Sequence, residues 1–219
     1  ISIKIEVMKT YKNKSTKKTW IQYGVFAIVA ITLYATGMHT EVIGFAQRGL
    51  LATGLMNPDV AEIAQVRSNK NENGNKPETT TNPTTQADFN LKLIDREGNT
   101  MSLEELKGKV IFMNMWATWC PPCVAEMPSI DKLHEEMGDE VAFVMLSLDQ
   151  NFEKAKAFDK RKGYNLPIYA AGSNLPEMYQ SSAIPTTYVI DAEGNLVLTH
   201  KGMADYSDPE FKKFLNSLK

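Results

Sequence analysis

The sequence is short of the residues that build metal sites and disulfide frameworks. Only two of its 219 residues are cysteine and three are histidine. Two cysteines cannot form the several bridges of a small secreted scaffold, so Cys120 and Cys123 form at most one local pair. A tetrahedral zinc site would need two further ligands, and His39, His134 and His200 do not stand at ligand-like spacing. We therefore expect neither a disulfide-rich scaffold nor a metal site.

An excess of basic residues is also missing, because the formal net charge is −2. The run Lys160-Arg161-Lys162 is short and lacks interleaved aromatic residues, so it is typical of a solvated helix face and we expect no nucleic-acid partner. Charge is instead distributed unevenly along the chain. Residues 1–19 carry six lysines and one glutamate, whereas residues 20–219 carry 18 basic and 25 acidic side chains. The two parts are therefore expected to lie in different surroundings.

Charged residues are absent from residues 20–38, and this stretch is long enough as a helix to cross most of a hydrocarbon core of roughly 30 Å. Lysines precede it, and Trp20 and Tyr23 lie near one border, so it predicts a single transmembrane anchor. The positive-inside rule makes residues 1–19 a basic cytoplasmic tail and places everything after the anchor on the extracytoplasmic, periplasmic side of the cell membrane. A buried core helix and a cleaved signal peptide are the alternatives.

Three segments follow the predicted anchor. Residues 39–67 mix apolar and polar positions, and we expect one or two helices in this juxtamembrane segment. Residues 68–86 consist mostly of Asn, Thr, Lys, Glu and Pro. Because such a composition cannot bury enough apolar surface to fold, this segment is expected to be a disordered linker. Strand-like and helix-like segments then alternate, which predicts a folded domain over residues 88–219.

The folded domain has the pattern of an α/β protein with parallel strands first and an antiparallel pair at the end. Continuous apolar runs predict strands over residues 89–94, 110–116, 141–148, 167–170, 186–190 and 196–200. Amphipathic runs predict helices over residues 102–106, 121–137, 152–162, 176–181 and 209–218. Between the last two strands, residues 191–195 carry the acidic, Gly and Asn residues of a hairpin turn.

The two cysteines stand where redox chemistry requires them, after a buried strand and at the start of a helix. A helix N-terminus favours a thiolate on the first sulfur, so Cys120 is predicted to be the exposed nucleophile and Cys123 the resolving thiol. Pro121 suits the first helical position because its missing N–H would have no partner there. A purely structural disulfide is the alternative, but closing so small a loop would stabilise little.

Residues 88–219 resemble the TlpA/ResA-like branch of the thioredoxin superfamily. The resemblance rests on motifs at family positions: Trp-Cys-Pro-Pro-Cys at 119–123, Trp116 before it, Glu126 and Pro128 after it, and Ile-Pro-Thr-Thr at 184–187. It implies a thioredoxin-like fold with a central mixed sheet flanked by helices. It also implies a thiol-disulfide oxidoreductase that needs no cofactor.

The resemblance further implies a substrate-binding surface and partners. Pro185 is expected to be a cis-proline against the active-site disulfide, and the residues expected at the substrate are Trp119, Pro121, Pro122, Ile184 and Pro185. The implied substrates are disulfide-bearing exported proteins, apocytochrome c among them. A membrane thiol protein is implied as the electron donor.

One position departs from thioredoxin itself, which has an aspartate six residues before the first cysteine. Asn114 stands there in this chain, and an amide cannot titrate. Glu126 lies one helical turn beyond Cys123 on the same face of the predicted helix. We therefore expect Glu126 to handle protons and to have a raised pKa in a partly buried site. An exposed helix carboxylate is the alternative.

Two rival functions are a peroxiredoxin-like peroxidase and a copper-binding chaperone. A peroxidatic cysteine would follow a Pro-x-x-x-Thr sequence, whereas Ala-Thr-Trp precedes Cys120. A copper chaperone would space its cysteines more widely and add a usable histidine. Eleven methionines are present, and those on predicted buried strands or a helix face, such as Met113 and Met127, are expected to fill the core.

Overall fold

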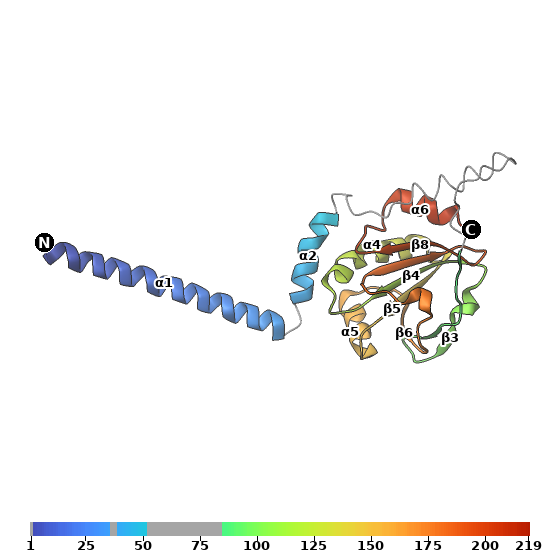
Figure 1. Ribbon diagram of the computed structural model, residues 1–219, viewed down its shortest axis with the longest axis horizontal. Coiled ribbons are helices and arrows are strands. Elements are labelled where there is room, and N and C mark those ends of the chain that lie inside the picture. Colours follow the sequence, from blue (N-terminus) through green and yellow to red (C-terminus); the bar gives the residue numbers. More distant parts are fainter. Residues whose placement is uncertain (1, 36–38, 52–84) are drawn as a thin grey trace. The chain divides into compact units, whose positions relative to one another are not determined.

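The computed structural model describes residues 2–35, 39–51 and 85–219 (Figure 1). The chain divides into two compact units, Ile1–Val42 and Ile43–Lys219. Helix α1 spans Ser2–Ala35 and helix α2 spans His39–Leu51. Helix α2 agrees with the helix expected in the juxtamembrane segment, whose remaining residues lie outside the described part of the chain.

Residues 20–35 of the predicted transmembrane span lie in α1, and residues 36–38 lie outside the described part of the chain. Over the ranges that the structure describes, no helix combines the length and the apolar character that crossing a membrane requires.

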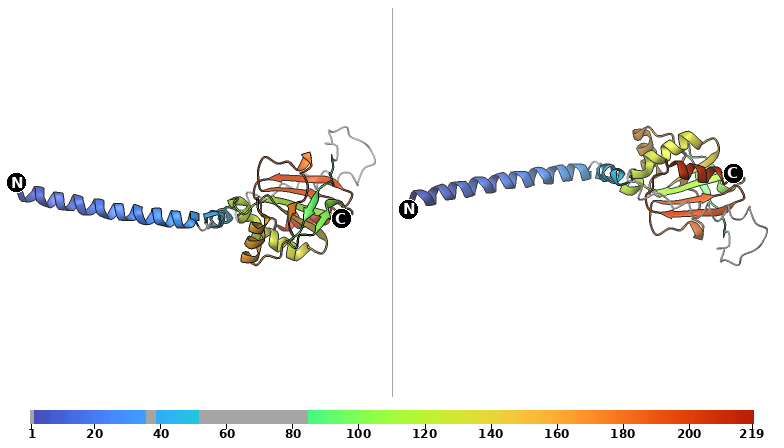
Figure 2. Two further views of the ribbon diagram at one scale, coloured as in Figure 1. Left: turned by 90° about the horizontal axis from the view of Figure 1, so that it is seen from below. Right: turned by 90° about the horizontal axis from the view of Figure 1, so that it is seen from above.

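The domain is built on a mixed eight-stranded sheet in the order β1-β8-β7-β4-β5-β6-β2-β3. Strands β4, β5 and β6 are parallel, and β7 runs antiparallel to both β4 and β8. Both views of Figure 2 show β7 and β8, in orange to red, side by side. The strands are β1 (Thr85–Gln86), β2 (Lys92–Ile94), β3 (Thr100–Ser102), β4 (Val110–Trp116), β5 (Val141–Ser147), β6 (Ile168–Ala171), β7 (Thr186–Ile190) and β8 (Asn195–Lys201).

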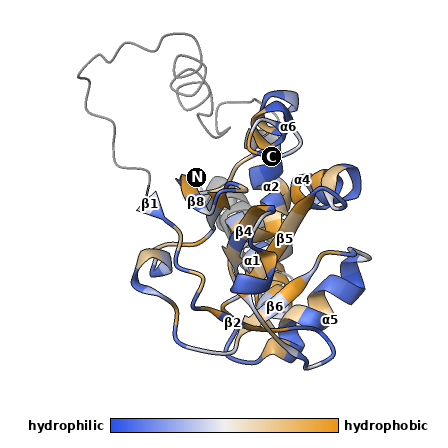
Figure 3. Ribbon diagram, turned by 90° about the vertical axis from the view of Figure 1, so that its right-hand side faces the viewer, coloured by the Kyte–Doolittle hydropathy of each residue, from blue (hydrophilic) through white to orange (hydrophobic). Residues whose placement is uncertain are grey.

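Every residue of β4 is buried, because both faces of the sheet are covered. Alternate residues point to opposite faces, so Phe112 and Trp116 belong to one core cluster and Met113 and Met115 to the other. Three helices pack on the first face: α4 (Pro121–Met137), α5 (Phe152–Lys162) and α6 (Pro209–Asn216). The second face is covered by the chain around Leu91–Leu103 with the 3₁₀ helices η1 (Leu103–Leu106) and η2 (Glu177–Tyr179). Figure 3 shows apolar colouring in β5 and polar colouring along α5.

Most predicted elements are confirmed within a residue or two, and β4, α4, α5 and β7 have the predicted bounds. The predicted linker is wrong at its end, because residues 85–86 form β1 and pair with β8. The pairing needs no apolar side chain, so the polar composition gave no indication of it. Strand β3 was also not predicted. Residues 68–84 lie outside the described part of the chain.

Candidate active site

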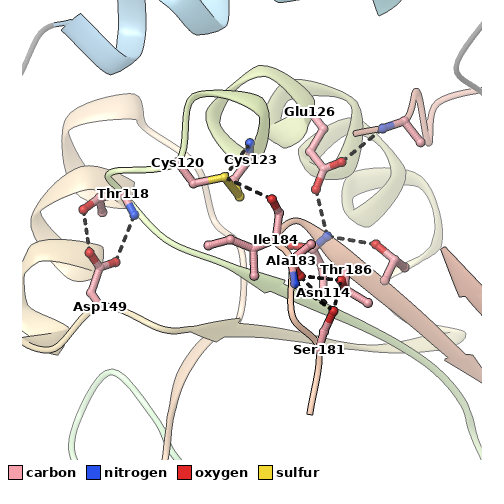
Figure 4. The surroundings of a disulfide bond; sticks show 12 residues. Asn114, Thr118, Cys120, Cys123, Glu126, Asp149, Ser181, Ala183, Ile184 and Thr186 are labelled. Carbon is pink, nitrogen blue, oxygen red and sulfur yellow. Dashed lines mark hydrogen bonds between the residues drawn. A yellow bond between two sulfur atoms is a disulfide. The ribbon is translucent and has the colours of Figure 1, made fainter. Parts of the chain in front are cut away.

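The two cysteines are joined in a disulfide with an S–S distance of 2.12 Å, in the turn between β4 and α4 (Figure 4). Cys120 is the N-cap of α4 and has an extended backbone, while its sulfur accepts a hydrogen bond from the backbone N–H of Cys123 at 3.2 Å. Pro121 and Pro122 occupy the first helical turn, where an N–H would have no helical partner. In the reduced protein, the same N–H and the helix N-terminus favour a negative charge on the Cys120 sulfur.

The expectation that Cys120 is exposed is wrong for this disulfide form. Cys120 keeps 4% of its surface exposed and Cys123 keeps none. The Cys120 sulfur lies 3.7 Å from the carbonyl oxygen of Ile184, which covers it. Trp119 is 58% exposed beside it, so the apolar surface available to a partner is next to the sulfur.

The loop before β7 supplies the rest of this surface. The Ile184–Pro185 peptide bond is cis, as the resemblance implied. Ile184 is half-buried and Pro185 buried, while Pro121 and Pro122 on the opposite side are both half-buried. The Thr186 hydroxyl donates to the carbonyl oxygen of Ala183 at 2.7 Å, which fixes the loop at its end. All five residues predicted to bind substrate therefore lie in the two segments that meet at the sulfur.

A second loop contact was not predicted. Asp149 follows β5 and accepts hydrogen bonds from the backbone N–H of Thr118 at 3.0 Å and from its hydroxyl at 2.7 Å. Ser147 also donates to Asp149 at 3.0 Å. These bonds tie the segment that precedes Cys120 to the end of the neighbouring strand (Figure 4).

Glu126 lies in the interior, with none of its surface exposed. The alternative of an exposed helix carboxylate is therefore wrong, and burial is more complete than expected. Its Oε1 accepts a hydrogen bond from the Asn114 amide at 2.8 Å, and its Oε2 accepts one from the backbone N–H of Ala204 at 3.1 Å. Burial raises the pKa of Glu126 from 4.5 to about 8, although both hydrogen bonds oppose the increase. A carboxyl group with this pKa can exchange protons near neutral pH.

The network extends beyond Glu126 to two residues whose roles the sequence did not indicate. The Asn114 amide nitrogen also donates to the Thr187 hydroxyl at 2.9 Å. The Tyr206 hydroxyl donates to the same Thr187 oxygen at 2.6 Å. Burial, reinforced by the charge of Glu126, raises the pKa of Tyr206 well above 10, so its hydroxyl keeps its proton. Tyr206 lies 86 positions from Cys120, and no motif connects them.

In the described part of the chain, no three His, Cys, Asp or Glu side chains are grouped so that they could hold a metal ion. The methionines Met113, Met115, Met127 and Met145 are buried in the two core clusters, as expected. Trp116 is likewise a core residue.

The model of the Redoxin family matches residues 77–216, which is more than half of the chain. The chain belongs to the Redoxin family. The thioredoxin-like protein YneN of Bacillus subtilis is similar to this chain, with 34% identity over 128 residues, covering 57% of this chain and 74% of YneN. The thiol-disulfide oxidoreductase ResA of Halalkalibacterium halodurans is 34% identical over 129 residues, covering 58% of this chain and 73% of ResA.

Solved structures agree with this Redoxin assignment. A thiol:disulfide interchange protein of the thioredoxin family from Chlorobium tepidum is similar with a TM-score of 0.53 and 26% identity, covering 64% of this chain and 99% of that protein. This Redoxin protein is thus a ResA-like member of the thioredoxin superfamily and a thiol-disulfide oxidoreductase.

Proposed function

We propose that this oxidoreductase reduces disulfides in exported proteins by dithiol–disulfide exchange. The observation that carries the proposal is the Cys120–Cys123 disulfide at the start of α4, with the buried Glu126 carboxyl group one helical turn beyond Cys123. A disulfide without an adjacent proton acceptor would need another group to activate its second thiol.

The exchange proceeds in two steps from the dithiol form. The Cys120 thiolate attacks one sulfur of the substrate disulfide, which forms a mixed disulfide and releases one substrate thiolate, which takes up a proton. Cys123 then loses its proton and attacks the Cys120 sulfur, which releases the second substrate thiol and closes the Cys120–Cys123 bond. Two electrons pass to the substrate, and a thiol donor restores the dithiol.

Glu126 is proposed to take up and return the proton of Cys123. An ordinary cysteine has a pKa of about 8.5, so a carboxyl group with a pKa of about 8 can accept its proton at little cost. A negative charge on Glu126 also opposes a thiolate nearby, which keeps the thiol pKa values high. Glu126 makes no covalent bond to substrate in this scheme.

The location and partners are part of the same proposal. We infer that the N-terminal segment holds the domain at a membrane on its extracytoplasmic side, where disulfide-bearing proteins occur. Lysines precede residues 20–35 of α1, a stretch with no charge, and most of its large apolar side chains are exposed, among them Phe26 at 72%. The resemblance to the ResA-like branch supports apocytochrome c as a substrate and a membrane thiol protein as the electron donor.

The test is a redox titration of the purified protein. We expect a reducing potential, nearer to about −270 mV, as in thioredoxin, than to about −120 mV, as in a strong oxidant. The reason is that Pro121 and Pro122, with no histidine between the cysteines, add no positively charged group that would stabilise the Cys120 thiolate further. A potential above about −160 mV would assign the protein to disulfide donation instead.

A further inference from the structure

Thr187 stands between a tyrosine and an asparagine in the core beneath the disulfide. It is paired directly with Asn114 across the antiparallel strands β4 and β7. Directly opposite residues share a face of the sheet, and this is the face on which α4 packs. The Thr187 hydroxyl oxygen thus accepts one hydrogen bond from the Asn114 amide nitrogen and another from the Tyr206 hydroxyl.

A threonine oxygen has two lone pairs, and both are used here as acceptors. The Asn114 amide nitrogen has two hydrogens, and it gives one to Thr187 and the other to Glu126. Its own carbonyl oxygen, Oδ1, is buried and has no hydrogen-bond partner. An orphaned acceptor favours the opposite amide orientation, which is opposed as long as Glu126 and Thr187 both accept from the amide nitrogen.

We propose that Tyr206 is a positioning residue whose hydroxyl keeps Thr187 an acceptor and thereby holds the Asn114 amide nitrogen against the Glu126 carboxylate. Without the Tyr206 hydroxyl, the Thr187 hydroxyl is free to turn and donate to the Asn114 oxygen. The amide then rotates, the orphaned oxygen gains a donor, and Glu126 loses the hydrogen bond that favours its charged form. The inference deepens the proton role proposed for Glu126.

The neighbouring titratable groups Cys120, Cys123 and His200 should not change charge in the pH range where Glu126 titrates. Cys120, the N-cap of α4, and Cys123 in its first turn are bonded to each other in the oxidised protein and do not titrate. His200 on β8 is paired with Thr187 and shares its face of the sheet. Burial lowers the pKa of His200 from 6.5, so it is neutral where Glu126 titrates.

The experiment compares Tyr206→Phe with Tyr179→Phe in the oxidised full-length protein, with the side-chain carboxyl of Glu126 followed by ¹³C NMR against pH. Tyr206→Phe keeps the ring contacts with Phe112 and Phe211, whose centroids lie at 5.1 and 5.0 Å. Tyr179 is equally buried but belongs to the core cluster on the other face. Tyr206→Phe should move the Glu126 midpoint upward by about half a pH unit, a roughly threefold lower carboxylate fraction at a given pH. Tyr179→Phe should leave it in place.

Threonine variants separate positioning from packing. Thr187→Ser keeps the hydroxyl and should retain the midpoint, while Thr187→Val removes the hydroxyl that could turn and donate to the Asn114 oxygen. Adding Tyr206→Phe to Thr187→Val should cause no further shift, because the tyrosine acts through Thr187. An additive shift, or an unchanged midpoint in Tyr206→Phe, overturns the inference. If the midpoint shifts but disulfide exchange keeps its pH profile, the positioning role stands and the proton role of Glu126 fails.

Discussion

The amide nitrogen of Asn114 lies 2.8 Å from Oε1 of Glu126, in a place where neither side chain has any exposed surface. Thioredoxin has an aspartate at the position of Asn114, so the titratable group beneath the disulfide has moved from the strand to the helix. The amide cannot carry the proton, but it can stabilise a carboxylate that does. In this pair, Glu126 is the group that can carry the proton, and Asn114 stabilises its charged form.

Replacing Glu126 by Gln should lower the pKa of the active-site thiols, because it removes a negative charge that opposes the thiolates. Alkylation rates of the reduced protein measured against pH give the test. The pH profile of substrate reduction should change as well, while the Cys120–Cys123 bridge still forms. Glu135→Gln, at an exposed position of the same helix, is the matched control. Superimposable alkylation curves for Glu126→Gln and the unaltered protein would place the proton route elsewhere.

Glu126 should also make the stability of the oxidised protein depend on pH. Its folded pKa, about 8, lies above the ordinary value of 4.5, so the folded state binds the proton more tightly. This contribution is fully present below pH 4.5 and is lost as the pH rises through 8, by roughly 2–5 kcal/mol. Urea unfolding at pH 5 and pH 8 measures it. Glu126→Gln should show a flatter dependence, offset by about 1 kcal/mol because one donor loses its acceptor. Equal slopes in the two proteins would contradict the raised pKa.

The two cysteines should behave differently although both are buried in the disulfide form. Cys120 caps the helix and receives the Cys123 N–H, whereas Cys123 lies inside the first turn. Cys123→Ser should accumulate a mixed disulfide between Cys120 and substrate, detectable on a non-reducing gel. Cys120→Ser should accumulate little, and equal trapping by both variants would reverse the assignment of nucleophile and resolving thiol.

Thr118 should matter through its hydroxyl. Thr118→Val keeps the shape of the side chain but removes the bond to Asp149, and we expect a loss of about 1 kcal/mol in the free energy of unfolding. Disulfide reduction should slow severalfold, because the segment before Cys120 is less firmly placed. Thr118→Ser keeps a hydroxyl and should restore most of both quantities. A rate unchanged in Thr118→Val would limit this contact to a structural role.

The proposed location predicts protease access from outside the cell. Protease added to intact spheroplasts should remove the domain that begins near residue 85, because that domain is proposed to be extracytoplasmic. A cytoplasmic marker protein should survive the same treatment. Protection of the domain until the membrane is lysed would reverse the proposed orientation.

Local chemistry explains what could be predicted from the sequence. The continuous apolar run of β4 and the prolines at the start of α4 act over a few residues, so their bounds and the place of the cysteines were predictable. Glu126 could be found because helical periodicity places it one turn from Cys123. Tyr206 and the Thr187 hydroxyl could not, because their contacts depend on how the chain after β8 returns over the sheet. The position of the Ile184 carbonyl oxygen next to the Cys120 sulfur likewise depends on the tertiary structure.

The short strand β1 has a consequence for the outer edge of the sheet. Thr85 and Gln86 are paired with Leu196 and Asn195 of β8, and the Gln86 side chain donates to Asn195. An open edge offers unpaired backbone groups to other chains and promotes aggregation. Two residues with polar side chains cover the start of β8, and a charged residue, Lys201, stands at its other end. A protein cut after Gln86 would expose this edge and should self-associate through it at high concentration.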